Sequence, residues 1–291
     1  MAIAAPPVAP DNGCSLDPFC RLMSQRIFFA HANGFPCATY GKMFDALAPD
    51  FEVTHIGLHG HDPLFPVDDN WTNLVEELAQ RLSRLDQPVW GVGHSMGGIL
   101  HYHTALRHPE LYRGVVMLDS PVPTWFDQTV IWLAKRLGFI DRLTPAGRTL
   151  GRRERFDDRQ QARDYFADKA LFRDFDPECL DAYVEHGLTE DEQGLRLRFD
   201  PETEIRIYRS VPHLTPGWPP TLRVPVAMVR GEKSNVVMPH HSYLLRLMPH
   251  GRALSVPGGH MFPFERPLET AGVLRQLLGE WSEASLRGRF A

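Results

Sequence analysis

The feature that most constrains the fold is a glycine-rich stretch, GVGHSMGG at residues 91–98. An expected strand, residues 88–92, leads into it, and an expected helix, residues 99–107, follows and ends before His108-Pro109. A turn this tight requires small residues beside Ser95, and Gly93 and Gly97 meet that requirement. The Ser95 hydroxyl would then project at a helix N-terminus, where free N–H groups favour developing negative charge. Ser95 is therefore the candidate nucleophile.

Composition limits the other possibilities. The chain has 291 residues, 43% of them hydrophobic, which is enough for one sizeable core with an elaborated insertion. A net charge of −5 argues against a nucleic-acid partner, because phosphates require a basic surface. No apolar run has the length of a membrane span, and residues 1–11 carry no positive charge ahead of an apolar run, so we do not expect a secretory signal. We therefore expect a cytoplasmic protein, with its oligomeric state left open.

Metal binding is not expected from the sequence. The four cysteines fit no paired metal spacing, and His55, His59 and His61 have no carboxylate or cysteine that completes a site. Residues 1–25 are rich in alanine and proline, and we interpret them as a loosely ordered N-terminal extension.

Alternating apolar and amphipathic segments predict a sheet with helices. Helical spacing covers residues 40–47, 71–85 and 268–281, with Asp69 and Asn70 as the expected caps of the second helix. Such alternation is typical of a mostly parallel sheet covered by helices on both faces. The expected buried strands are residues 26–30, 52–56, 88–92, 114–118, 224–229 and 253–256.

Residues 121–220 interrupt this pattern. They are rich in charged and aromatic residues and predict short helices at 125–137, 158–166 and 176–186, followed by a proline-dense return. A loop of this length without a function is uncommon. Trp125 and Phe126, with His94 beside Ser95, are our candidates for an apolar substrate pocket.

A serine hydroxyl needs a base, and histidine has a suitable pKa. His260 follows an expected strand end and two glycines, in VPGGHMFP at residues 256–263. A base on such a loop can reach over the carboxyl edge of an open parallel sheet, where ligands bind. His260 is therefore the candidate base.

The Gly-His-Ser-Met-Gly turn and the Gly-Gly-His stretch resemble the α/β-hydrolase family over about residues 26–281. The resemblance implies an α/β-hydrolase fold with a helical cap inserted after the strand that follows the nucleophile helix. The cap would comprise residues 121–220, and the hydrolase core would comprise residues 26–120 and 221–291.

The acid that orients the histidine stays open. Family members most often carry an aspartate where this chain has Ser234, and serine cannot supply the charge. Some members carry the acid one strand earlier, where this chain has Asp119, while Glu232 is the alternative near the usual position. Asp119 is our preferred acid, and the acid could also lie elsewhere.

The resemblance implies an oxyanion hole, with one donor from the amide of Met96 and a second from residues 32–35, for which we choose Phe35. The implied activity is hydrolysis of a small or medium hydrophobic carboxylic ester through an acyl-enzyme on Ser95, without metal or organic cofactor. The alternatives are a carbon–carbon bond or other acyl hydrolase with the same triad, and a hydrolase-like small-molecule receptor without turnover.

Overall fold

A computed structural model describes residues 25–215 and 222–286. The expected extension therefore lies outside the described residues, except for Gln25. That side chain is buried and accepts a hydrogen bond from Trp90 Nε1 at 2.9 Å. No helix in the described ranges is long and apolar enough to cross a membrane.

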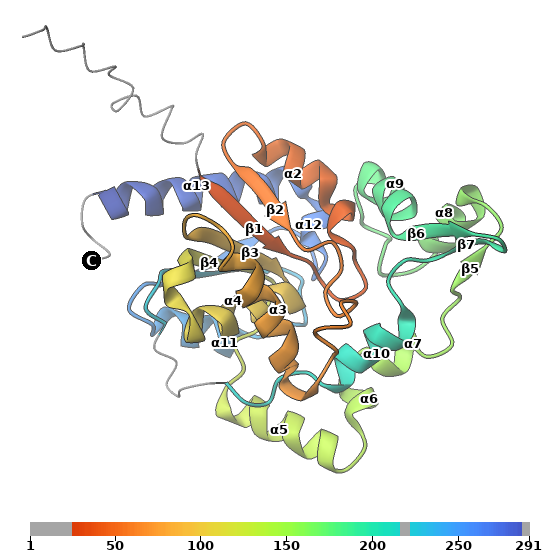
Figure 1. The fold of residues 1–291 in the computed structure, drawn as a ribbon, viewed down its shortest axis with the longest axis horizontal. Helices are drawn as coiled ribbons and strands as arrows, with labels where there is room; N and C mark the ends of the chain where they lie inside the picture. The colour runs from red at the N-terminus through yellow and green to blue at the C-terminus, as the bar shows by residue number, and fades with distance from the viewer. Residues whose placement is uncertain (1–24, 216–221, 287–291) are drawn as a thin grey trace, which may run out of the picture.

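The centre of the molecule is a six-stranded sheet in the order β2-β1-β3-β4-β8-β9, and every neighbouring pair is parallel (Figure 1). The expected strands are all present, with ends shifted by a few residues. Their bounds are β1 (Arg26–Ala30), β2 (Glu52–His55), β3 (Val89–His94), β4 (Tyr112–Leu118), β8 (Val226–Gly231) and β9 (Gly251–Val256).

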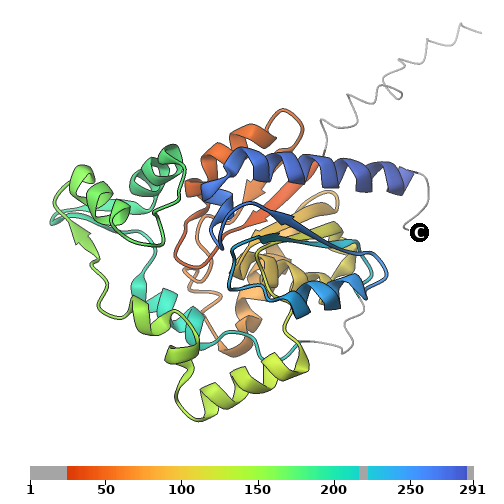
Figure 2. The same cartoon turned by 180° about the vertical axis from the view of Figure 1, so that it is seen from behind.

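Side chains alternate between the two faces of this sheet, as period-two strands require. Ile27 and Phe29 of β1 belong to one buried cluster and Phe28 to the other. The first cluster is covered by α2 (Gly41–Leu47), α12 (Phe262–Glu265) and α13 (Pro267–Leu286). The second is covered by α3 (Thr72–Leu82), α4 (Met96–Arg107) and α11 (Pro239–Arg246). Both faces of the sheet are therefore closed, and the long helix α13 crosses the upper side in Figures 1 and 2.

The start of α3 differs from the prediction. The side chains of Asp69 and Asn70 do not cap the helix, and Asp68 Oδ1 accepts a hydrogen bond from Asn73 N at 2.9 Å. Asn70 and Trp71 have φ of 61° and 55° in a short 3₁₀ turn, η2 (Asp69–Trp71), which turns the indole of Trp71 into the core. The two further 3₁₀ turns of the core are η1 (Cys37–Tyr40) and η3 (Pro109–Leu111).

Residues 121–220, which we call the insert, come between the adjacent strands β4 and β8 in the sequence, and the described part of the insert, residues 121–215, lies at the right and bottom of Figure 1. The described part is not wholly helical, because it contains a three-stranded antiparallel sheet in the order β5-β7-β6 that the sequence analysis did not predict. Its bounds are α5 (Trp125–Arg136), α6 (Ile140–Leu143), α7 (Ala146–Thr149), β5 (Arg155–Phe156), α8 (Arg159–Ala167), α9 (Pro177–His186), β6 (Leu188–Asp191), β7 (Gly194–Leu197) and α10 (Pro201–Arg209).

Aspartates begin several insert helices. The carboxylates of Asp158, Asp176 and Asp200 accept hydrogen bonds from backbone N–H groups in the first turns of α8, α9 and α10. An aspartate at this position satisfies a donor that the helix itself leaves unpaired. Local sequence therefore fixes where these helices start. The aromatic rings of Phe172, Phe175 and Tyr183 then pack against Phe35 of the core.

Candidate active site

Ser95 lies at the turn between β3 and α4, with φ 52° and ψ −112°. This strained backbone is held by a hydrogen bond from Ser95 N to Leu118 O at 2.9 Å and by close packing of the glycines. A Cβ on Gly93 would lie 2.2 Å from the carbonyl carbon of Gly97, and one on Gly97 would lie 2.0 Å from Ala30 O. No side chain fits at either position, so the glycine pattern is a steric requirement of the turn.

His260 is bonded to Asp119. Its Nδ1 lies 2.7 Å from Asp119 Oδ2, and because the carboxylate accepts, Nδ1 donates. The proton on Nδ1 leaves Nε2 as the ring nitrogen that can accept one. Asp119 follows β4, with φ 45° and no exposed area. A buried carboxylate therefore orients the imidazole. This carboxylate lies at the end of β4, and β4 is the neighbour of β3, the strand that leads to Ser95.

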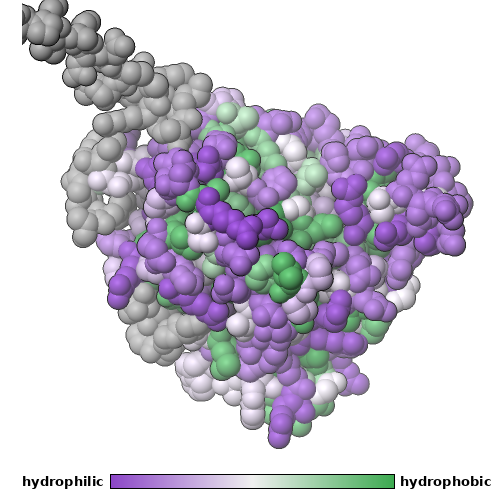
Figure 3. Space-filling model, in the orientation of Figure 1, coloured by the Kyte–Doolittle hydropathy of each residue, from purple (hydrophilic) through white to green (hydrophobic). Residues whose placement is uncertain are grey.

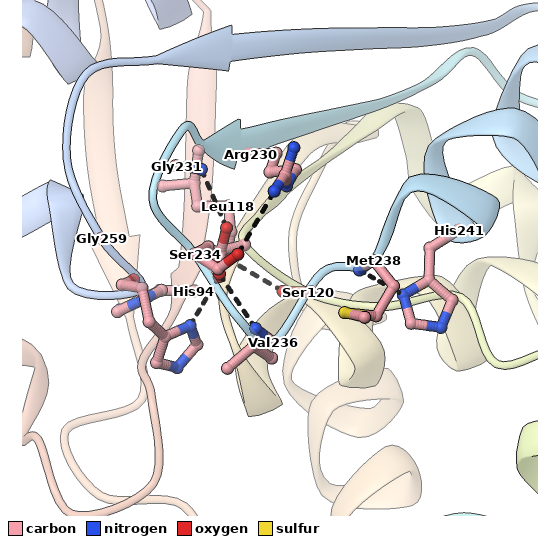
Figure 4. Close-up of polar contacts among 12 residues, drawn as sticks. His94, Leu118, Ser120, Arg230, Gly231, Ser234, Val236, Met238, His241 and Gly259 are labelled. Carbon is pink, nitrogen blue, oxygen red and sulfur yellow. Dashed lines mark hydrogen bonds and ion pairs between the residues drawn. The ribbon is translucent and has the colours of Figure 1, made fainter.

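Ser234, at the position where a family aspartate is usual, bonds directly to Asp119. Its hydroxyl donates a hydrogen bond to Oδ2, and Gly231 N donates to Oδ1 at 2.9 Å. Figure 4 shows Gly231 and Ser234 together with Leu118 at this point, and Met238 and His241 further along the chain, where the loop ends and α11 begins. These donors satisfy the buried carboxylate, which would otherwise carry a large desolvation cost.

Glu232, the alternative acid, is exposed on this loop. Within the described residues its carboxylate makes no contact with His260. Of the two acids weighed from the sequence, the structure brings Asp119 to the imidazole.

His94 connects three segments of the site. It has no exposed area, and its Nε2 lies 2.9 Å from His260 O, so Nε2 carries the proton that this carbonyl accepts. Its Nδ1 then accepts from the Tyr40 hydroxyl at 2.8 Å, and that oxygen accepts from Ala32 N at 3.1 Å. Burial, and next the nearby imidazole of His260, hold the pKa of His94 well below its usual value, so the ring is neutral. His94 lies beneath the site, and its expected part in a substrate pocket stays a prediction.

The amides that the sequence offers as oxyanion donors differ in their hydrogen bonding. Within the described residues, the Met96 amide has no hydrogen-bond partner. The Phe35 amide, our choice from the sequence, donates to Ala32 O at 3.1 Å and is already used in a turn. The amides of Asn33 and Gly34 have no such partner in the described part of the chain. They are better candidates than Phe35 for the second donor.

An ion pair of the insert packs on this loop. Arg152 Nη2 lies 2.5 Å from Glu204 Oε2, and the carboxylate is buried. Asn33 Nδ2 donates to Glu204 O at 3.0 Å, and a Cβ on Gly34 would lie 3.1 Å from the Glu204 carboxyl group. With φ +82° and this neighbour, position 34 requires glycine. The insert therefore helps to fix the shape of the loop.

Trp125 and Phe126 are not enclosed. Their exposed fractions are 65% and 63%, and Trp125 lines a shallow surface hollow with Trp132 and Leu214. Their expected part in substrate binding stays a prediction.

Sequence reasoning attached no role to His240 and His241. Both Nε2 atoms lie near Asp127 Oδ2, at 3.4 and 3.3 Å, which is the one histidine–carboxylate group of metal-site size among the described residues. However, Met238 N donates to His241 Nδ1 at 3.0 Å, so Nε2 of the neutral ring carries the proton. A metal-binding histidine needs the opposite arrangement, with its second nitrogen donating. The cluster therefore fits a contact between α5 and α11 better than a metal centre.

Comparison with known proteins agrees with this architecture. The model of the alpha/beta hydrolase family matches residues 27–273, which include Ser95, Asp119 and His260. The chain belongs to this family.

Proteins similar to this alpha/beta hydrolase share only a modest part of its sequence. The type I acyl-CoA thioesterase mpaH of Penicillium brevicompactum is 27% identical over 176 residues, which cover 54% of this chain and 38% of that protein. The chain thus spans well under half the length of this relative. The crystal structure of E-2-(acetamidomethylene)succinate hydrolase has a TM-score of 0.67 and 20% identity, covering 88% of this chain and 91% of the other.

The structure of an esterase of M. tuberculosis has a TM-score of 0.65 and 22% identity, covering 88% of this chain and 86% of the other. Likeness at these identities establishes the fold and leaves the substrate open. The family and the named relatives together support a hydrolase.

Proposed function

We propose that this chain hydrolyses an ester of a hydrophobic carboxylic acid through an acyl-enzyme on Ser95, with His260 as general base oriented by Asp119. The observation that carries the proposal is the 2.7 Å contact between His260 Nδ1 and Asp119 Oδ2, which leaves Nε2 for the serine hydroxyl. The His260 loop also touches the nucleophile turn, because His94 Nε2 lies 2.9 Å from His260 O.

The first half of the reaction forms the acyl-enzyme. His260 Nε2 takes the proton of Ser95 as its oxygen attacks the carbonyl carbon. The Met96 amide and an amide of Asn33 or Gly34 hold the oxyanion. The imidazolium then protonates the leaving alcohol, and a water molecule activated by His260 releases the acid. The insert serves as a cap over this site. Each step uses groups of the chain and the substrate.

A thioester is the second candidate substrate. The named Penicillium relative is a type I acyl-CoA thioesterase, and an acyl thioester forms the same acyl-enzyme on a serine. A panel of matched oxygen esters and thioesters with increasing acyl length would decide between the two classes by kcat/KM.

The first test is labelling with a fluorophosphonate probe. We expect rapid modification of Ser95, no labelling of Ser95→Ala, and retained labelling of Ser120→Ala, which removes another buried serine hydroxyl near the turn. A receptor without turnover would hydrolyse neither substrate class. A carbon–carbon bond hydrolase would be labelled and yet leave the ester and thioester panel intact.

A further inference from the structure

Helix α5 of the insert is amphipathic, and its large apolar side chains are exposed to solvent. Positions 125, 126, 132, 133 and 137 share one side at helical spacing. Trp125, Phe126, Trp132, Leu133 and Leu137 are exposed by 65, 63, 49, 42 and 64% of their surface. A helix of a globular protein normally turns its apolar side toward the core. Here that side faces solvent.

Polar contacts fix this orientation. Lys135 forms an ion pair with Asp69 of the core, and its Nζ lies 3.1 Å from His213 Nδ1. At the other end of the helix, Asp127 faces His241 of α11. The side of α5 that faces the rest of the molecule is mixed, because Ala134 is buried and Ile131 is partly buried beside Asp127 and Lys135. The exposed aromatic rings therefore belong to a helix that specific contacts hold in place.

The same segment is basic in an acidic protein. Residues 125–149, which contain α5, α6 and α7, carry a net charge of +2 from four basic and two acidic residues, whereas the whole chain carries −5. Arg136, Arg142 and Arg148 are exposed, and their side chains have no ion-pair or hydrogen-bond partner within the described residues. Leu143 and Leu150, exposed by 49% and 53%, lie on α6 and next to α7, which follow α5.

We propose that the surface formed by α5, α6 and α7 binds the headgroup region of an anionic lipid bilayer. Tryptophan, phenylalanine and leucine on one side of a helix, with basic residues beside them, are the chemistry by which a helix lies in a membrane interface. Figure 3 shows hydrophobic and hydrophilic residues side by side at the lower edge of the molecule, where α5 lies in the same orientation in Figure 1.

Charge favours a bilayer over a second copy of the chain. A two-fold dimer through this face would place the surface against itself, and its excess of positive charge would meet the same excess. An anionic lipid surface supplies the opposite sign and accepts a convex apolar stripe. Attachment to the bilayer would place the insert next to the lipid phase, in which long-chain acyl compounds dissolve.

The test is cosedimentation of the full chain with vesicles of phosphatidylcholine alone or mixed with phosphatidylglycerol. We expect binding to the mixed vesicles that weakens as salt rises. Leu133→Ser combined with Leu137→Ser should reduce the partition coefficient by about tenfold or more. Arg142→Gln should reduce it by about fivefold.

Matched controls are Leu268→Ser, an equally exposed leucine on α13, and Arg107→Gln at the far end of α4. Neither should change the partition coefficient. Absence of binding to mixed vesicles, or equal binding to both kinds, would overturn the proposal. So would a dimer in light scattering that the leucine variants abolish while vesicles are not bound. Hydrolysis of a water-soluble short-chain ester, measured in parallel without vesicles, reports on the proposed function separately.

Discussion

The hydroxyl of Ser234 donates to the same oxygen of Asp119, Oδ2, that faces His260 Nδ1. The resemblance to the family implies an aspartate at the position of Ser234. In this chain the serine instead donates to a carboxylate that follows the neighbouring strand β4. The loop after β8 thus lies beside the bonded pair of Asp119 and His260 and contributes a donor to its carboxylate.

Asp119→Asn should lower kcat by up to about 10⁴-fold, because an amide stabilises the wrong imidazole tautomer. Glu232→Gln is the matched control, since Glu232 is exposed on the neighbouring loop, and it should leave kcat unchanged. Steady-state hydrolysis of a chromogenic ester measures both. If Glu232→Gln were the damaging change, the assignment of the acid would be wrong.

Ser234→Ala should reduce kcat by about tenfold, because it removes one hydrogen bond to a charged, buried oxygen. Ser234→Asp should be more harmful, since it brings a second carboxylate against Asp119 in a site that water does not reach. The comparison of kcat values and urea unfolding midpoints for the two variants checks this order. An active, stable Ser234→Asp enzyme would contradict it.

Tyr40→Phe should lower both stability and activity. It removes the donor to His94 Nδ1, a buried nitrogen, at a cost of about 1–3 kcal/mol, and it loosens the contact from His94 to the His260 loop. Tyr112→Phe is a close control, because the Tyr112 hydroxyl pairs with His101 Nδ1 at 3.1 Å, also buried but outside the site. We expect similar losses of unfolding free energy and a fall in kcat only for Tyr40→Phe. Equal kcat values for the two variants would argue against a positioning role.

Glu204→Ala should destabilise the fold by about 3–5 kcal/mol, because it leaves Arg152 without its partner in a mostly buried place. Glu280→Ala breaks the pair with Arg252, in which both side chains are more than 40% exposed, and should cost less than about 1 kcal/mol. Urea denaturation measures both variants. Equal losses of unfolding free energy in the two variants would show that burial of the Glu204 carboxylate does not strengthen its ion pair.

Unfolding free energy should fall in mild acid. Burial lowers the pKa of His101 to about 3 and that of His103 to about 4, so the folded state keeps both neutral. The unfolded chain binds their protons below about pH 6.5. Stability is therefore complete above about pH 6.5 and decreases toward pH 4 by about 1.4 kcal/mol per pH unit for each histidine. His103→Gln should flatten this slope in urea titrations at a series of pH values, and an unchanged slope would contradict the assignment.

The fold could be predicted from the sequence where a local pattern is compatible with only one backbone structure. The glycines around Ser95 allow only a tight strand-to-helix turn, and the alternating apolar runs gave the strands and the parallel sheet. The short strands β5, β6 and β7 were missed because their few residues, such as Leu188–Asp191, carry no clear alternation among many charges.

Other features depend on long-range contacts that no local pattern records. The hydrogen bond from the Phe35 amide to Ala32 O, for example, belongs to a turn that the local sequence does not reveal. His240 and His241 gained a partner only because α5 packs near α11. Likewise, α5 is held in place in part by the ion pair of Lys135 with Asp69, a residue far away in the chain.

The insert leaves from β4 and returns to β8, and these two strands are hydrogen-bonded neighbours. Asp119 follows the carboxyl end of β4, where the insert begins, and its Oδ1 accepts a hydrogen bond from Gly231 N, at the carboxyl end of β8, at 2.9 Å. The contacts of the Asp119 carboxylate with Gly231, Ser234 and His260 are therefore made within the core and involve no residue of the insert. A different segment grafted between these two strands would therefore leave the bonded pair of Asp119 and His260 in place, but it would have to supply a new partner for the loop of Asn33 and Gly34, which Glu204 contacts here.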